Sequence, residues 1–162
     1  MTLTCRQLYI AGAALCLLLI AAAMYFQHIL GMEPCPLCIF QRLAVMATGL
    51  VLLIAAIHNP AGIGRRIYSF LSLLTAASGA AIATRHVWLQ HLPADEVPTC
   101  GPGLNYILDT FPLHEALSMV LRGSGECAEV HWSFLGLTIP GWTLIMFMIL
   151  SLLSLTLLLK RT

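Results

Sequence analysis

Four long stretches of the sequence are almost continuously apolar, and short polar or turn-forming segments separate them. A membrane-crossing helix needs about 20 predominantly apolar residues, since each residue rises by ~1.5 Å. Trimmed of their flanking turn residues, the stretches cover about residues 8–30, 39–57, 67–90 and 140–159. The pattern predicts an all-α membrane protein, in which residues 1–162 form a single integral membrane domain built as a four-transmembrane-helix bundle.

The composition agrees with a membrane protein and excludes other classes. Of the 162 residues, 59% are hydrophobic and only 9% are charged, whereas soluble domains have roughly 45–50% apolar and about 25% charged residues. Disordered chains are polar and rich in charge, so disorder is excluded as well. The net charge is +1 and no run of Lys and Arg exceeds two residues, so the chain lacks the basic patch of a nucleic-acid-binding protein.

The first apolar stretch has one alternative interpretation, a cleaved signal peptide. Arg6 precedes it, and the alanines at positions 21–23 resemble a cleavage site. The apolar core of a signal peptide spans only about 7–15 residues, however, and this stretch continues past the alanines to Leu30. A membrane-spanning helix is therefore expected.

The distribution of charge predicts the orientation. Four crossings place both termini and the turn near residues 58–66 on one side of the membrane. Lys and Arg in short loops mark the cytoplasmic side. The side of the termini holds Arg6, Arg65, Arg66, Lys160 and Arg161, while Arg42, Arg85 and Arg122 fall toward the other side. Both termini are expected in the cytoplasm, and the loops at about 31–38 and 91–139 are expected on the opposite, periplasmic side of a bacterial inner membrane.

The long periplasmic loop is rich in Pro and Gly and is expected to be irregular, apart from one short amphipathic helix. Its apolar positions at helical spacing are Leu113, Leu117, Val120 and Leu121, and Pro112 suits a helix start. The helix could lie on the bilayer surface or pack as an ordinary loop helix. The sequence leaves both options open.

Six cysteines fall into two groups. Cys5 and Cys16 lie on the cytoplasmic side and inside the first span, where a free Cys behaves as a small hydrophobic residue. The other four are expected on the periplasmic side, with Cys35 and Cys38 in the short loop and Cys100 and Cys127 in the long one. Because that compartment is oxidising, disulfides are the first interpretation of both pairs.

The pair Cys35 and Cys38 forms a C-x-x-C motif where the short loop meets the second span. A disulfide across so small a loop adds little stability, whereas a helix N-terminus favours the reactive thiolate. The spacing therefore favours a redox-active pair, with a zinc site and a purely structural bond as alternatives. Zinc is disfavoured because no second C-x-x-C is present, so no metal cofactor is expected.

The pair Cys100 and Cys127 lies between turn-forming residues. Alone it would indicate a structural staple, but beside a redox-active C-x-x-C it can instead accept an outside thiol and exchange internally with Cys35 and Cys38. Such a relay needs an electron acceptor that dissolves in the membrane, and a quinone meets this requirement.

Two further polar residues are candidates for a quinone site. Arg42 lies one helical turn after Cys38, where a cation could polarise a quinone carbonyl, or could snorkel to the interface. His86 reaches the same level from the third span and could donate a proton, or serve as an interfacial polar residue. Trp88, Tyr106, Trp132 and Trp142 are expected to be interfacial anchors.

The same residues resemble those of a known family, DsbB, the bacterial disulfide bond formation protein B. The matching segments, in family order, are Phe26-Gln27-His28, Pro34-Cys35-Pro36-Leu37-Cys38-Ile39-Phe40-Gln41-Arg42, Thr99-Cys100, Gly125-Glu126-Cys127-Ala128-Glu129, Trp132-Ser133-Phe134-Leu135-Gly136-Leu137 and Pro140-Gly141-Trp142. They run across nearly the whole chain.

This resemblance implies an inner-membrane protein-disulfide:quinone oxidoreductase that reoxidises a periplasmic DsbA-like thiol oxidase. It implies that reduced DsbA attacks Cys100, that Cys127 then attacks Cys35, and that Cys38 remains as the thiolate facing the quinone. Arg42 would lie beside the ring, and His86 matches a histidine linked to quinone use. The expected quinone is ubiquinone, with menaquinone as an alternative. The rival classes are a non-enzymatic membrane protein with two inert disulfides and a metal-binding membrane protein.

The predicted orientation is testable by labelling. In intact cells treated with a mild reductant, a thiol reagent that cannot cross the membrane should label Cys35, Cys38, Cys100 and Cys127 but not Cys5, because the charge bias places only the first four outside. Mass spectrometry of the labelled peptides reads the result. Labelling of the C-x-x-C only after the membrane is opened would contradict the orientation and, since the cytoplasm keeps thiols reduced, the redox role as well.

Overall fold

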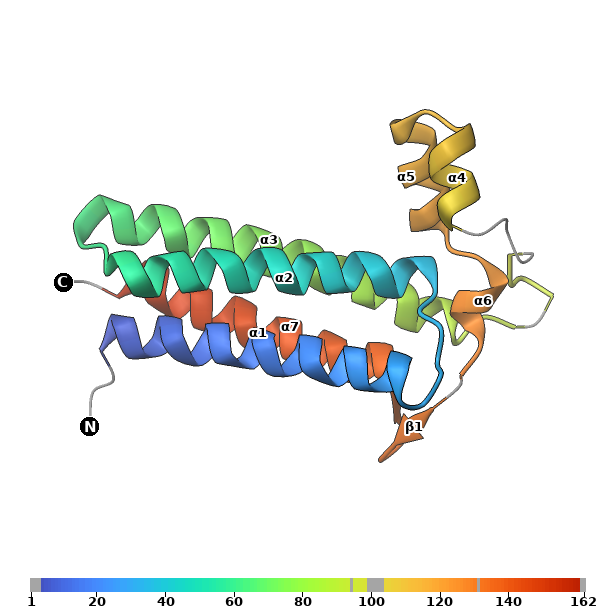
Figure 1. Cartoon of the computed structure of the whole chain (residues 1–162), viewed down its shortest axis with the longest axis horizontal. Helices are drawn as coiled ribbons and strands as arrows, with labels where there is room; N and C mark the ends of the chain where they lie inside the picture. The colour runs from blue at the N-terminus through green and yellow to red at the C-terminus, as the bar shows by residue number, and fades with distance from the viewer. Residues whose placement is uncertain (1–3, 94, 99–103, 131, 161–162) are drawn as a thin grey trace.

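Four long helices build the chain, as the computed structural model shows (Figure 1). The structure describes residues 4–93, 95–98, 104–130 and 132–160, without the side chains of residues 104, 105 and 108. The long helices are α1 (Cys5–His28), α2 (Pro36–His58), α3 (Gly62–Leu89) and α7 (Ile139–Leu159), each long and apolar enough to cross a membrane. The predicted fold class, an all-α four-helix membrane bundle, is confirmed. The chain is a multi-pass membrane protein.

The long helices begin before the predicted apolar stretches do, and at α1 and α2 the first residues favour a helix start. Thr4 and Gln7 form a capping box at the start of α1: the Thr4 hydroxyl accepts from the Gln7 amide, and the Gln7 side chain accepts from the Thr4 amide. Cys35 is the N-cap of α2 and Pro36 is its first residue, where a missing N–H costs nothing. The C-x-x-C motif therefore straddles the helix start instead of preceding it.

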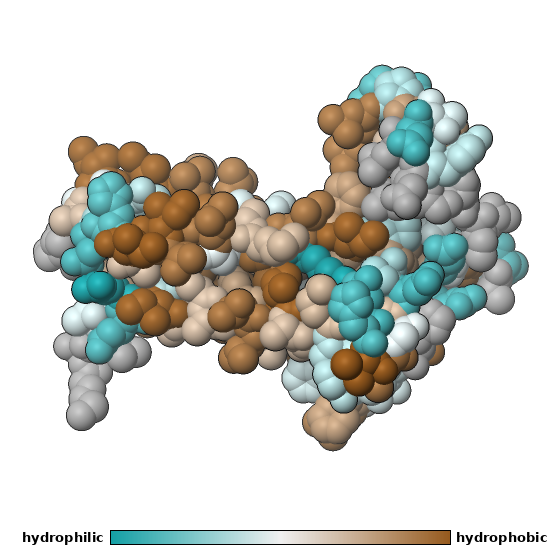
Figure 2. All heavy atoms as spheres, viewed as in Figure 1, coloured by the Kyte–Doolittle hydropathy of each residue, from teal (hydrophilic) through white to brown (hydrophobic). Residues whose placement is uncertain are grey.

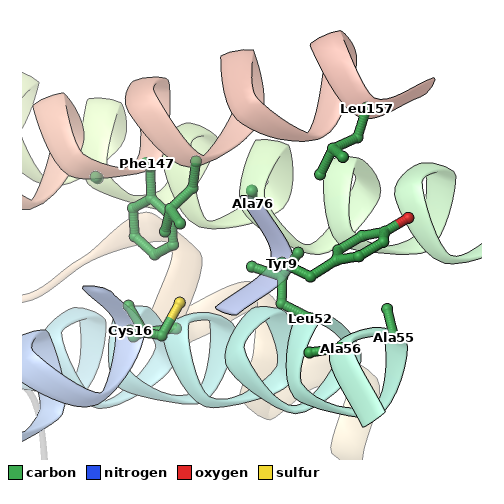
Figure 3. Packing of buried hydrophobic residues seen from close by; sticks show 11 residues of the cluster. Tyr9, Cys16, Leu52, Ala55, Ala56, Ala76, Phe147 and Leu157 are labelled. Atoms are coloured by element: carbon green, nitrogen blue, oxygen red, sulfur yellow. The ribbon is translucent and has the colours of Figure 1, made fainter. Parts of the chain in front are cut away.

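The helices pack in the order α1, α2, α3, α7, whereas α1 and α7 touch each other only sparsely. Buried apolar side chains from all four helices fill the middle of the bundle (Figure 3), with Leu52, Phe147 and Leu150 completely buried. Gly79 of α3 permits the close approach of α7, because a Cβ there would lie 2.2 Å from the Phe147 ring. The weak α1–α7 contact leaves a seam along one side of the bundle.

Hydrogen bonds between small polar side chains tie the helices together inside the apolar region. The Thr48 hydroxyl donates to Thr75 at 2.9 Å between α2 and α3, and Ser72 donates to Ser154 at 3.0 Å between α3 and α7. Such pairs are typical of helix contacts in lipid, where a polar group without a partner is costly. On the face seen in Figure 2, the length of the bundle is mostly apolar, and hydrophilic residues gather toward its two ends.

The long loop forms short elements at the end of the bundle opposite both termini (Figure 1). They are α4 (Leu104–Thr110), α5 (Leu113–Arg122), α6 (Gly125–Ala128), β1 (Ser133–Phe134) and β2 (Leu137–Thr138). Helix α5 covers the segment in which the sequence predicts a short amphipathic helix. The others were not predicted, because elements of two to seven residues are too short to show a periodic pattern. The β1–β2 hairpin turns on Leu135 and Gly136, both with positive φ.

Candidate active site

Three cysteine sulfurs and one imidazole meet where the outer loops rest on the bundle. Cys35 Sγ, Cys127 Sγ and a ring nitrogen of His86 all lie within 4.8 Å of one another. Cys38 Sγ joins them at 3.3 Å from Cys35 Sγ and 4.0 Å from His86 Nδ1. The short loop, α2, α3 and α6 each contribute one of the four residues.

The start of α2 positions the C-x-x-C pair. As N-cap, Cys35 keeps an extended backbone (φ −64°, ψ 163°), while Cys38 lies in the first helical turn. Cys35 Sγ donates a hydrogen bond to Cys38 Sγ, and at 3.3 Å the two are free thiols, since a disulfide bond measures about 2.05 Å. Orphan amides and the helix dipole at this end favour negative charge on a nearby group. Cys38 is therefore the sulfur best placed to carry charge.

A small apolar cluster holds Cys127 against the bundle. Leu37, Leu89, Val120 and Cys127 are each at most 3% exposed and pack together. The chain can approach α3 this closely because Gly123 has φ +84° and a Cβ there would lie 2.3 Å from Leu89. Cys127 Sγ also has a hydrogen bond with the backbone of Leu37 in α2. The docking brings one cysteine of the long loop to the C-x-x-C pair.

His86 is buried at 2% exposure and connects the three cysteines. Its Nε2 is 3.1 Å from the Cys127 carbonyl oxygen and 3.8 Å from Cys35 Sγ. A carbonyl only accepts, so Nε2 is the donor, and Nδ1 accepts from Gln41 Nε2 at 3.1 Å. Gln41 itself is 4% exposed. The side chain of His86 therefore faces the sulfur cluster instead of serving as an interfacial polar residue.

A cavity of about 690 Å³ adjoins the sulfur cluster and lies in the seam between α1 and α7. Cys35, Cys38 and His86 are in its wall. Most of the apolar part of the wall comes from α1 and α7, and includes Leu19, Ile20, Ala22, Ala23, Ile139, Pro140 and Met146. A mostly apolar cavity with a few converging polar groups is the usual form of a site for a small organic molecule, and typical volumes are about 300–1,000 Å³.

Arg42 lies in the wall of the cavity and crosses from α2 to α1. Its Nη1 donates to Gln27 Oε1, and its Nη2 donates to the Ala23 carbonyl oxygen at 3.1 Å. The side chain is half-buried. Arg42 thus reaches inward from α2 to α1 along the cavity wall and not outward to the membrane surface, which is the geometry that a binding role requires.

Aromatic rings close the outer end of the cavity. Phe26 and Trp132 have ring centroids 5.4 Å apart, Trp132 stacks on Phe134 at 5.9 Å, and Phe134 contacts Trp142 at 6.4 Å. All four rings line the cavity. The sequence predicts interfacial anchors at Trp132 and Trp142, and their place in this stacked wall is a role that it did not assign.

Arg85, beside His86 in the sequence, serves the outer loop. It donates to the carbonyl oxygens of Leu121 (3.3 Å) and Arg122 (3.0 Å) at the C-terminus of α5, and its guanidinium lies 4.2 Å from the centre of the Trp88 ring. A cation at a helix C-terminus satisfies free carbonyls and complements the dipole. Arg85 therefore helps to fasten α5, and with it the chain leading to Cys127, onto α3.

Of the six site residues predicted from the sequence, the structure brings five into one cluster with its cavity, namely Cys35, Cys38, Cys127, Arg42 and His86. Cys100 lies outside the described residues. The sequence prediction missed Gln41 and Gln27, which hold His86 and Arg42. Both are amides next to a span or inside it, and that is a detectable signal, because polar residues in such segments are usually functional.

The environment of Cys127 suppresses its ionisation while Cys35 is reduced. A hydrogen bond with Cys35 raises the pKa of the Cys127 thiol, and burial raises this pKa further. The backbone hydrogen bonds from the 124 and 37 positions act in the opposite direction and do not compensate. While Cys35 is a thiol, its hydrogen bond therefore disfavours the nucleophilic thiolate form of Cys127, and this cause is removed when Cys35 is in a disulfide.

The alkylation rate of reduced Cys127 is therefore expected to rise steadily through the alkaline range, without levelling off near the ordinary thiol pKa of about 8.5. Cys35→Ala removes the main cause of the shift, so the curve should move to lower pH. Mass spectrometry of timed iodoacetamide reactions measures the rate, and Cys5 provides an internal reference. A wild-type curve that levels off near the ordinary value, or one that Cys35→Ala leaves unchanged, would contradict the Cys35–Cys127 contact.

Comparison with known proteins assigns the chain to a family. The family model described as "Disulfide bond formation protein DsbB" matches residues 5–157. Proteins named "Disulfide bond formation protein B" are similar over most of their length: that of Nitrosococcus oceani is 57% identical over 96% of this chain and 92% of its own. That of Hahella chejuensis is 55% identical over 90% and 88% of the two chains. The chain belongs to the DsbB family and is a disulfide-forming oxidoreductase of the membrane.

Proposed function

We propose that this protein takes electrons from a reduced DsbA-like thiol oxidase in the periplasm and passes them to a quinone of the bacterial inner membrane. The observation that carries the proposal is the position of Cys35. Its sulfur lies 3.3 Å from Cys38 and within 4.8 Å of Cys127, beside a cavity of about 690 Å³ between two membrane-spanning helices. Cys35 thus lies next to the loop cysteine Cys127, next to its C-x-x-C partner Cys38, and next to a cavity between membrane-spanning helices.

The exchange balances as a series of thiolate attacks. A thiolate of the reduced partner attacks Cys100 and breaks the Cys100–Cys127 bond. Released Cys127 attacks Cys35, forms the Cys35–Cys127 bond and leaves Cys38 as a thiolate. The second partner thiolate then closes the partner's disulfide and releases Cys100. Cys100 attacks Cys127, which breaks the Cys35–Cys127 bond, releases Cys35 as a thiolate and restores the loop disulfide. The partner has lost two electrons and two protons, and these now reside on Cys35 and Cys38.

The proximity of Cys127 to Cys35 supports this order over the rival with two inert disulfides. A structural C-x-x-C bond needs no third sulfur within 4.8 Å. Attack on Cys35 also leaves the helix N-terminus to stabilise the departing Cys38 thiolate, and a better leaving thiolate accelerates exchange. Cys38 lines the cavity, whereas Cys127 belongs to the docked loop and packs against Leu37 and Leu89, so incoming and outgoing electrons would use different sulfurs.

The cavity residues fit a quinone ring. The stacked aromatic side chains and the apolar faces of α1 and α7 match a flat ring with an isoprenoid chain, and the seam between the helices gives that chain contact with lipid. A bound quinone would accept two electrons and two protons from Cys35 and Cys38. Ubiquinone is the proposed acceptor and menaquinone the alternative. Arg42 offers a cation to a carbonyl oxygen, and His86, linked to both sulfurs, is placed to carry a proton.

Quinone reduction by membranes tests the proposed function. Membranes containing the wild-type chain, supplied with a reduced DsbA-type protein and a short-chain ubiquinone, should reduce the quinone, while Cys38→Ser membranes should not.

Cys100→Ser should abolish turnover with the partner but leave Cys35 and Cys38 able to exchange electrons with quinone. Cys16→Ala, inside the bundle core, provides a control that should remain active. Retention of turnover by Cys38→Ser would rule out the proposed route.

Arg42 should influence the quinone step specifically. Charge-assisted hydrogen bonds contribute roughly 1.5–3 kcal/mol, and each ~1.4 kcal/mol is a factor of ten. Arg42→Ala should therefore slow quinone-dependent turnover about ten- to a hundredfold, and Arg42→Lys should lose less because it keeps the charge. Steady-state rates at varied quinone concentration measure the effect. Gln27→Ala removes the side-chain partner of Arg42 on α1 but leaves the cation and its hydrogen bond to the Ala23 carbonyl oxygen. An equal loss in that variant would show that Arg42 acts through this contact between the helices and not through its charge.

A further inference from the structure

The sulfur cluster also has the composition of a metal site. Cys35, His86 and Cys127 are each at least partly buried, and their donor atoms all lie within 4.8 Å of one another. Cys38 Sγ lies 3.3 Å from Cys35 Sγ and 4.0 Å from the His86 ring. Three cysteines and one histidine form one of the standard ligand sets for structural zinc. The sequence argument against zinc depended on the missing second C-x-x-C, and the docked loop and α3 supply the other two ligands.

The distances suit a tetrahedral ion. Zinc bonds of about 2.3 Å to sulfur and about 2.0–2.1 Å to nitrogen place ligand atoms roughly 3.5–3.8 Å apart. Cys35 Sγ is 3.8 Å from His86 Nε2 and 3.3 Å from Cys38 Sγ. Side-chain adjustments smaller than about 1 Å would therefore bring Cys35, Cys127 and His86 around one ion, with Cys38 next to the fourth position.

Residues around the cluster could hold the histidine ligand in the orientation that metal binding needs. A histidine that binds a metal through one nitrogen donates its other N–H to a fixed acceptor. If Nε2 binds the ion, the proton moves to Nδ1, and the Gln41 amide can rotate to accept it through Oε1, since this buried amide already contacts Nδ1. The cavity gives access from outside, and the exposed side chains of Glu33 and Glu126 line it at that end.

We propose that the reduced form of this protein binds Zn²⁺ through Cys35, Cys127 and His86, with Cys38 as the fourth donor. Binding converts each coordinating thiol to a thiolate and releases its proton, so no electron moves. A Cys35–Cys38 disulfide removes two of the donors. A Cys100–Cys127 disulfide would remove a third, so zinc and either disulfide exclude each other, and zinc binds only chains in which both cysteine pairs are reduced. The site goes beyond the quinone and partner reactions and does not depend on them.

Cobalt titration of the reduced, quinone-free protein in detergent tests the site, because tetrahedral Co²⁺ with thiolate ligands absorbs visibly and Zn²⁺ then displaces it. We expect one Co²⁺ per chain, with a sulfur-to-metal charge-transfer band that Zn²⁺ removes. Cys127→Ser and His86→Ala should each weaken binding at least tenfold, and Gln41→Ala about ten- to a hundredfold, the usual effect of losing a residue that orients a ligand. Oxidised wild type should not bind.

The controls separate this site from binding at isolated thiols. A Cys5→Ser/Cys100→Ser double variant should bind like wild type, because neither residue belongs to the proposed ligand set. Circular dichroism confirms folding of each variant, and oxidised wild type provides a folded sample of unchanged sequence. The proposal is overturned if the double variant loses the band, if Cys127→Ser and His86→Ala keep full affinity, or if oxidised protein binds equally well. None of these outcomes bears on quinone reduction, which is measured separately in membranes.

Discussion

The contact between the long outer loop and the end of the bundle is the interaction on which the site depends. The contact buries an apolar cluster of Leu37, Leu89, Val120 and Cys127. Beside this cluster, His86 donates a hydrogen bond to the Cys127 carbonyl oxygen. Burying such a carbonyl without a donor would be costly, so the histidine and the loop hold each other in place. The same contact sets the separation between Cys127 and Cys35.

The second constraint is the incomplete closure of the helix bundle. Helices α2 and α3 pack on each other and on their neighbours, whereas α1 and α7 approach each other only sparsely. Arg42 of α2 lines the cavity at this gap, and Gln27 of α1 accepts a hydrogen bond from its guanidinium. The aromatic side chains of the outer hairpin then cover the outer end of the gap. The cavity is therefore a consequence of bundle topology, and it places the quinone proposed above next to the C-x-x-C pair.

The sequence predicted best those features that depend on residues close together along the chain. Four apolar stretches predict four helices, since the membrane allows little else for an uninterrupted apolar segment, and the spacing of Cys35 and Cys38 predicts their closeness. Gln41 could have been found too, because an amide three residues after Cys38 inside a span is unusual. The link between His86 and Cys127 could not, since it depends on Gly123 and Leu89 meeting across 34 positions of sequence. The stacking of Trp132 depends in the same way on a two-residue hairpin turn with positive φ, which local hydrophobicity does not show.

The complete burial of Cys127 has a consequence for the fidelity of the pathway. At 0% exposure the Cys127 sulfur is shielded from ordinary thiols in solution, so under the proposed function such a thiol reacts with the loop disulfide at Cys100 and not at Cys127. Free cysteines of unfolded proteins in the same compartment are thereby kept from direct exchange with Cys127. The docked loop thus shields one sulfur of its disulfide and leaves the other as the point of entry. The soluble partner that binds at that point then determines which thiols become oxidised.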